Sequence, residues 1–139
     1  MRYTVLVMLG LLICAEVVMA GDFWIRKSGS LWARVESDGA VRIDGSIVGR
    51  VESDGTVRRD GSIVGEVESD GTIREGGSIV GEIEPGGSLR KHGSITGEVE
   101  DGGTIRRHGS IWGTAETTCA AHGCKRVVAA VLVFFSGDF

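Results

Sequence analysis

Apolar and polar residues alternate in short runs along the middle of the chain, and the pattern returns every sixteen residues. The run Gly-Ser-Ile-Val-Gly and its variants begin at Gly29, Gly45, Gly61, Gly77, Gly93 and Gly109. Self-similarity at a fixed period indicates an architecture of repeated structural units. We therefore expect six copies of one unit between Phe23 and Glu116.

Each copy contains one long and one short stretch with the two-residue period of a β-strand. In the copy that begins at Ser46, the long stretch places Ile47, Gly49 and Val51 on one face. The short stretch is 56–58, with Val57 at its centre. We expect these apolar residues to share the buried face of a sheet.

Three-residue loops that end in glycine are expected between successive strands. Such a loop sets Val51 opposite Val57, and Val57 opposite Ile63, so that one face of the sheet stays apolar. It consists of a type I turn followed by a left-handed residue, normally glycine. The single proline, Pro85, opens one loop, where its fixed φ suits the first turn position. The eleven expected left-handed glycines are Gly29, Gly39, Gly45, Gly55, Gly61, Gly71, Gly77, Gly87, Gly93, Gly103 and Gly109.

The predicted fold is all-β: six hairpin repeats that form a twelve-stranded antiparallel meander closed into a shallow barrel. Closure removes the exposed edges of the sheet. The middle residue of each long strand, such as Gly49, is expected where pairing passes from one short strand to the next. Twelve strands enclose more space than their own side chains fill. The apolar segment 127–135 is therefore expected at the centre, as a helix or as a strand.

A β-solenoid is the alternative fold. One coil of sixteen residues per repeat would stack a ladder of isoleucines and produce a self-associating scaffold. Left-handed glycines at both loops of every repeat favour hairpins over solenoid corners. The ladder would consist of Ile47, Ile63, Ile79 and Ile95.

The first twenty residues have the layout of an export signal. Arg2 precedes an apolar run over 5–13, and Ala20 offers a small residue for cleavage before Gly21. An uncleaved membrane anchor is the alternative, although Glu16 is costly inside a bilayer. A third alternative is a lipoprotein signal at 11–14 that ends in Cys14. All three export the repeats, to a periplasmic, extracellular or membrane-anchored location.

The chain therefore divides into a signal peptide or membrane anchor (1–20), a six-repeat β-domain (21–116) and a hydrophobic C-terminal segment (117–139). Cys119 and Cys124 are expected to form a disulfide in an oxidising compartment. The alternative is that these cysteines and His122 are three metal ligands, for which no fourth partner lies nearby.

Charges also repeat with the period of sixteen. The cross-strand register sets Arg74 opposite Glu66. The first copies differ, because Arg34 faces Arg42 there, as Arg50 faces Arg58. The resulting basic patch is either a solvated face or a contact with an anionic lipid or polymer. It consists of Arg34, Arg42, Arg50, Arg58 and Arg59.

The net charge of −4 gives no basic footprint and argues against nucleic-acid binding. No nucleophile–base pair, paired buried carboxylates or phosphate loop can be assembled from the sequence, so we expect neither an enzyme nor a cofactor site. His92 and His108 occupy loop positions where other copies carry aspartate. We interpret these histidines as solvent-exposed turn residues.

The repeat Gly-Ser-Ile-Val-Gly-Glu-Val-Glu, followed by an Asp-Gly turn and Thr-Ile-Arg, resembles that of the β-flower proteins over residues 23–116. Those proteins are similar to the Tubby C-terminal domain and its phospholipid-scramblase relatives. The resemblance implies a barrel of twelve strands around a hydrophobic helix, here within 120–135. The phosphoinositide-binding residues of Tubby have no counterparts in this chain.

Taken together, these features predict a non-enzymatic binding or structural module of the cell envelope. A membrane lipid or another envelope component is the expected partner, because both ends of the chain are hydrophobic and one side of the barrel is basic. The sequence does not indicate an oligomeric state.

Overall fold

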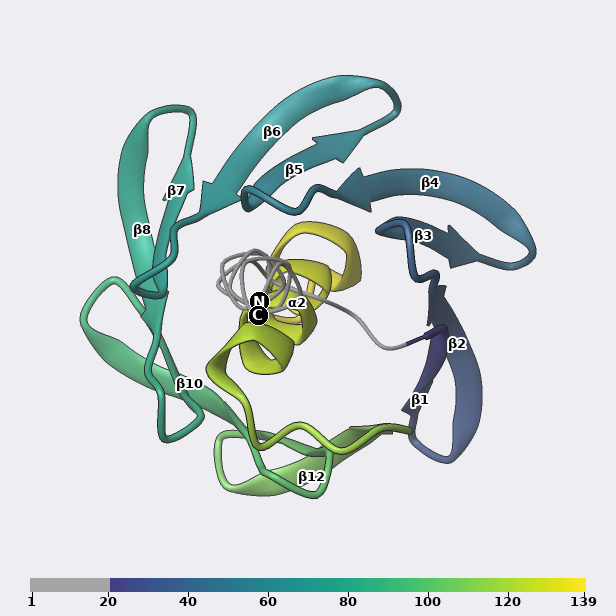
Figure 1. Ribbon diagram of the computed structural model, residues 1–139. Coiled ribbons are helices and arrows are strands. Elements are labelled where there is room, and N and C mark those ends of the chain that lie inside the picture. Colours follow the sequence, from purple (N-terminus) through teal and green to yellow (C-terminus); the bar gives the residue numbers. More distant parts are fainter. Residues whose placement is uncertain (1–20) are drawn as a thin grey trace, which may run out of the picture.

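The computed structural model describes residues 21–139 and contains twelve antiparallel strands in one closed barrel. Each strand pairs with its neighbours in the sequence, and β1 pairs with β12 to close the ring (Figure 1). The short strands are β1 (Phe23–Lys27), β3 (Ala40–Ile43), β5 (Thr56–Arg59), β7 (Thr72–Glu75), β9 (Ser88–Lys91) and β11 (Thr104–Arg107). The long strands are β2 (Ser30–Val35), β4 (Ser46–Val51), β6 (Ser62–Val67), β8 (Ser78–Ile83), β10 (Ser94–Val99) and β12 (Ser110–Ala115).

This topology confirms the predicted repeat-built barrel and excludes the β-solenoid. A solenoid would stack equivalent strands of successive coils, whereas here each long strand lies between two short ones. Gly49 pairs with Val41 on one side and with Arg59 on the other, so pairing does pass between neighbours at the middle of the long strand. Each repeat therefore extends outward as a hairpin arm (Figure 1).

The loops are of two kinds, and the prediction of eleven three-residue loops is correct for five of them. In the loop after β4, the amide of Gly55 donates to the Glu52 carbonyl, and Val51 lies opposite Val57 as predicted. The other six connections are two-residue turns in which both residues have positive φ, for example 52° at Asp60 and 84° at Gly61. This is the type I′ turn, whose twist matches that of the two strands it joins.

The two-residue turns change the register that follows. Val57 lies opposite Gly65 rather than the predicted Ile63, which instead pairs with Arg58. A β-bulge between these pairs absorbs the extra residue and reverses the side-chain alternation. Ile63 is therefore 62% exposed on the outer surface, and the prediction that such isoleucines are buried is wrong.

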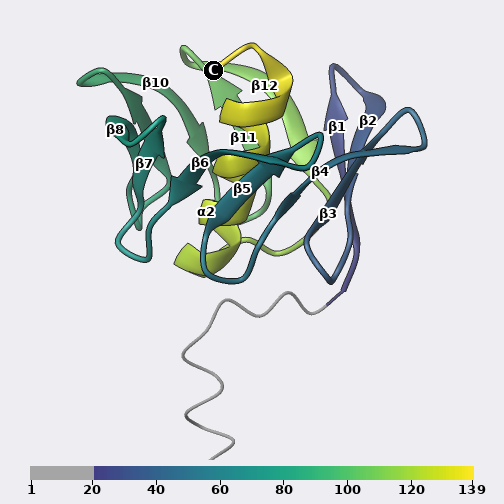
Figure 2. The same ribbon diagram turned by 90° about the horizontal axis from the view of Figure 1, so that it is seen from above.

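The C-terminal segment fills the centre of the barrel as a helix, so the strand alternative is also wrong. Helix α2 (His122–Val131) continues into a π-helical turn, η1 (Leu132–Ser136), along the barrel axis (Figures 1 and 2). Residues 128–132 have no exposed surface. They pack against the inward-facing side chains of the strands, among them Val57, Ile73 and Leu89. No helix within 21–139 is both long and apolar enough to cross a membrane.

A buried lysine holds the N-terminal turn of α2 in the barrel. Lys125 is 1% exposed, and its Nζ donates to the Asp101 carboxylate (2.5 Å) and to the carbonyls of Ala120 (3.2 Å) and Pro85 (3.4 Å). These acceptors compensate the ammonium group for its lost hydration. No pattern in the sequence singled out this residue.

A disulfide joins Cys119, which precedes α2, to Cys124 in the first turn of α2, and the two Cα atoms lie 5.2 Å apart. The Nε2 atom of His122 lies 3.0 Å from the Ile83 carbonyl oxygen. Within residues 21–139, no three His, Cys, Asp or Glu side chains converge as metal ligands. The predicted export signal and membrane anchor fall on residues 1–20, outside the described part.

The end of the chain is docked to the barrel through Asp138. Its carboxylate accepts a hydrogen bond from the Trp112 indole (3.0 Å) and pairs with Lys27 (2.7 Å). Hydrogen bonds from Lys27 and then Trp112 hold the pKa of Asp138 below its ordinary value. In addition, Lys91 Nζ donates to the backbone oxygen of Phe139 (2.9 Å).

Acidification is expected to release this docked end. A carboxyl group whose pKa is lower in the folded state stabilises it above the unfolded pKa, near 4, and loses that contribution as pH falls through the folded pKa. The difference in melting temperature between wild type and Asp138→Asn should therefore be present at pH 6 and disappear toward pH 2. Asp60→Asn, in an exposed turn, is the matched control. A pH-independent difference for Asp138→Asn would contradict the prediction.

Candidate functional site

The outer surface carries a repeated set of ion pairs. Arg74 does face Glu66 across the strands, as predicted, but its guanidinium pairs with Glu68 (2.5 Å). The same short-strand arginine pairs in every repeat with the glutamate that follows a long strand. These pairs are Arg26–Glu116, Arg42–Glu36, Arg58–Glu52, Arg74–Glu68, Arg90–Glu84 and Arg106–Glu100.

The predicted basic patch is assembled but largely neutralised. Arg34 faces Arg42, and Arg50 faces Arg58, as the register predicted. Four of the five arginines have carboxylate partners, and among residues 21–139 only Arg59 of the patch has none. The pairs are Arg34–Asp22, Arg42–Glu36, Arg50–Asp38 and Arg58–Glu52.

Asp22 illustrates why the sequence overstated the patch. The predicted register compared only residues that face each other across strands, whereas this pair joins Arg34 to a residue twelve positions earlier, as Arg50–Asp38 does one repeat later. In the structure its Oδ2 accepts from Arg34 (2.5 Å), and its Oδ1 accepts from the amide of Ser37 (2.8 Å). These two hydrogen bonds, that of Arg34 first, lower the pKa of Asp22.

The exposed surface feature common to all six repeats is apolar and not basic. Each hairpin arm exposes one aliphatic side chain, two residues beyond its two-residue turn, with exposed fractions from 52% for Leu31 to 65% for Ile111. Because strand direction alternates in the meander, all six turns lie at one end of the barrel, the end that holds Phe139 (Figure 2). We call these side chains the aliphatic crown: Leu31, Ile47, Ile63, Ile79, Ile95 and Ile111.

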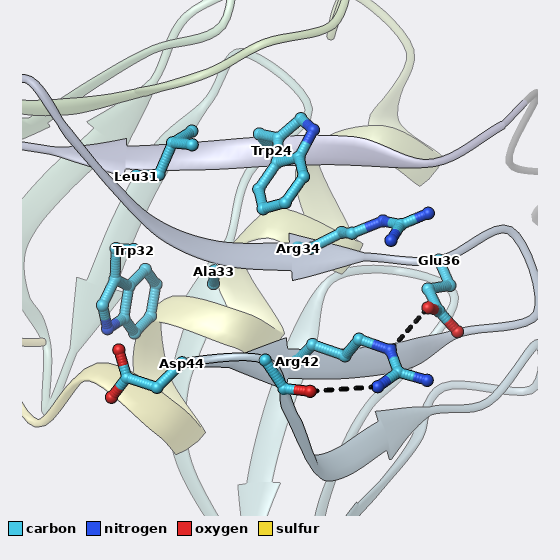
Figure 3. A pocket seen from close by; sticks show the side chains of 9 residues that line it. Trp24, Leu31, Trp32, Ala33, Arg34, Glu36, Arg42 and Asp44 are labelled. Atoms are coloured by element: carbon cyan, nitrogen blue, oxygen red, sulfur yellow. Dashed lines mark hydrogen bonds and ion pairs between the residues drawn. The ribbon is translucent and has the colours of Figure 1, made fainter.

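Grooves at equivalent positions recur around the barrel. The first is a cavity of about 350 Å³ lined by residues of the first two arms, including Trp32, Arg34 and Asp44 (Figure 3). Equivalent grooves one and three repeats later measure about 210 and 230 Å³. In these two grooves Val48 and Val80 stand where the first has Trp32.

Two tryptophans distinguish the first groove. Trp24 is 41% exposed at the position that is alanine, threonine or serine in the other five repeats, and the Arg34 guanidinium lies 5.5 Å from the centre of its ring. Trp32 meets Trp112 edge to face, with ring centres 5.5 Å apart. Trp112 is in turn fixed by its hydrogen bond to Asp138. The first groove therefore has one accessible indole and one that is held in place.

The charges that line the first groove are balanced. Arg34 and Arg42 carry two positive charges, while Glu36 and Asp44 carry two negative ones. Sequence reasoning identified the arginines but missed the tryptophans. The available signal was the departure of positions 24 and 32 from the residues common in the other repeats.

Comparison with known protein families, with curated proteins and with solved structures found no match.

Proposed function

We propose that this chain is a non-enzymatic, membrane-associated binding module of the cell envelope, whose hairpin end contacts a lipid surface. The observation that carries the proposal is the aliphatic crown. Six large apolar side chains, each more than half exposed at the same end of the barrel, are unusual on a surface that only faces water. Insertion of each into the interfacial layer contributes about 1 kcal/mol.

The resemblance to β-flower proteins and their scramblase-like relatives is consistent with this proposal. The export signal predicted for residues 1–20 would place the barrel outside the cytoplasm, where a disulfide between Cys119 and Cys124 can form. Phe23 begins β1 next to Val35, at the end of the barrel opposite the crown. An uncleaved anchor at residues 1–20 would attach that opposite end to a membrane, so the proposal applies to the chain after these residues have been removed. Cleavage after Ala20 leaves the hairpin end free to approach a membrane.

The basic patch plays a smaller part in this proposal than the sequence suggested. Four of its arginines are paired with carboxylates, so attraction to anionic lipid is weak and easily screened by salt. Apolar insertion depends little on salt. Membrane association is therefore expected to persist at high ionic strength.

Vesicle flotation tests the crown directly. Residues 21–139, which contain every strand and the central helix, should float with phosphatidylcholine vesicles at both low and high salt, about 0.1 and 1 M. Replacing Ile47, Ile63 and Ile79 with serine should lower the partition coefficient by at least about tenfold, because three apolar insertions are lost. Sedimentation equilibrium on the same samples monitors self-association.

The matched control replaces Arg50 and Arg59 with serine on the same arms and should leave flotation within about twofold. The proposal fails if the wild-type chain does not float, or if the serine variant floats equally well. A loss of oligomer mass without loss of flotation would assign the crown to self-association instead.

A further inference from the structure

We propose that the first groove, between the first two hairpin arms, binds a pyranose ring of a neutral saccharide. This site shares Leu31 with the aliphatic crown but binds a different class of ligand, and its test requires no membrane. Its volume of about 350 Å³ lies at the lower end of the range for small-molecule sites. This volume fits a single sugar unit. Because the groove opens to solvent on the outer surface, the rest of a longer saccharide chain can extend out of it.

The two indoles supply the apolar part of the site. A pyranose ring has one face of C–H bonds and a rim of hydroxyl groups, so it matches a flat apolar ring with polar groups at its edge. Trp24 on β1 and Trp32 on β2 present such rings to the same groove (Figure 3). Trp32 is held by Trp112, so little side-chain entropy is lost when a ligand binds.

The polar groups of the groove favour a neutral ligand. The two arginines are already engaged, Arg34 with Asp22 and Arg42 with both Glu36 and the Gly45 carbonyl. A phosphate or carboxylate would have to displace these partners, and a cation would meet both guanidiniums. The balanced lining charge therefore disfavours ions of either sign.

Hydrogen-bonding capacity remains at the mouth of the groove. Within residues 21–139, the Asp44 carboxylate has no hydrogen bond or ion pair, and the indole N–H of Trp32 on the same side of the groove has no acceptor, whereas the Trp24 nitrogen is turned away from both (Figure 3). A carboxylate accepts and an indole N–H donates, and a sugar hydroxyl does both. The free groups thus match a ring of hydroxyls, with the stronger, charge-assisted bond at Asp44.

The repeat itself provides the matched controls. Asp60 occupies the position of Asp44 in the next groove, where Val48 replaces Trp32. Both aspartates sit in the first position of a type I′ turn at φ 54° and 52°, a conformation that asparagine also adopts readily. Asp44→Asn and Asp60→Asn therefore make the same change in the same backbone, with and without the indoles nearby.

The test titrates the full chain, purified in a detergent without a sugar headgroup, with cellotriose, chitotriose, maltotriose and mannotriose, and follows binding by calorimetry and tryptophan fluorescence. We expect saturable binding of at least one trisaccharide. Asp44→Asn should weaken it by about fivefold or more, and Asp60→Asn should leave it unchanged. Trp24→Thr, which introduces a residue the other repeats use, should weaken it by about tenfold.

The proposal is overturned if none of the four trisaccharides binds saturably, if Asp44→Asn and Asp60→Asn weaken binding equally, or if Trp24→Thr binds like the wild type. Tighter binding of glucose 6-phosphate than of the neutral sugars would likewise overturn it. Because vesicles are absent, these results are independent of whether the crown binds lipid.

Discussion

Replacing Gly87 with alanine is expected to destabilise the barrel by about 3 kcal/mol. Gly87 closes the three-residue loop between β8 and β9 with φ at +105°, a conformation that L side chains rarely adopt. A Cβ there would press on the carbonyl group of Val99 in β10, with its carbonyl carbon 3.2 Å away. That carbonyl belongs to the backbone and cannot turn aside as a side chain would. Lys125 Cε at 3.4 Å restricts movement toward the helix.

The preceding residue provides the control. A methyl group added at Gly86 would meet no atom within 4 Å, and the φ of this residue lies outside the left-handed region. Alanine at Gly86 should leave stability unchanged, or raise it by about 0.4–1 kcal/mol by restricting the unfolded chain. Urea unfolding followed by circular dichroism measures both variants. Equal losses of unfolding free energy would contradict the assigned backbone conformation.

Loops of this kind also show what the sequence could predict. In the loop between β4 and β5, a three-residue connection keeps Val51 opposite Val57 and a two-residue turn does not, so hydrophobic pattern and turn chemistry agree. The number of strands, their alternating lengths and the closure of the barrel all depend on that agreement. The central helix could be anticipated as a filler, since twelve strands leave room for one.

The two-residue turns could not be predicted from the sequence pattern. Asp60-Gly61 fits either a type I′ turn or the end of a three-residue loop, and the pattern alone favoured the register that buries Ile63. The actual register depends on a bulge at the middle of β6, where Gly65 lies against both Val57 and the ring of Phe134. That packing joins residues nearly seventy positions apart, and no local pattern contains it.

The candidate site was hidden for a related reason. When a sequence is interpreted by its sixteen-residue period, the features that the repeats share are recognised first, and positions at which one repeat differs are passed over. Trp24 is such a deviation, and Trp32 has a tryptophan counterpart only in Trp112 of the last copy. In this repeat protein, the residues common to the copies determine the shape of the barrel, and residues that are not common to the copies form the candidate site.

Replacing Leu132 with aspartate is expected to have the largest effect, a loss of about 5 kcal/mol or more. Leu132 has no exposed surface and lies where α2 passes into η1, within the ring of strands. A carboxylate at this position loses its hydration within the apolar core cluster to which Leu132 and Val128 both belong. Because small domains have about 5–15 kcal/mol of stability in total, most of the chain should unfold.

Two further variants distinguish the loss of the apolar core around the central helix from general damage to that helix. Leu132→Met keeps the volume and should cost less than about 1.5 kcal/mol. Val133→Asp places the same charge on the next residue, which is only partly buried, and should cost much less than Leu132→Asp. Urea unfolding gives the three free energies, and hydrogen exchange across the β1–β12 pair reports whether the ring stays closed. If Leu132→Asp matched Val133→Asp with that pair still protected, the strands would close without a filled centre, and the helix would be an occupant of the barrel rather than its core.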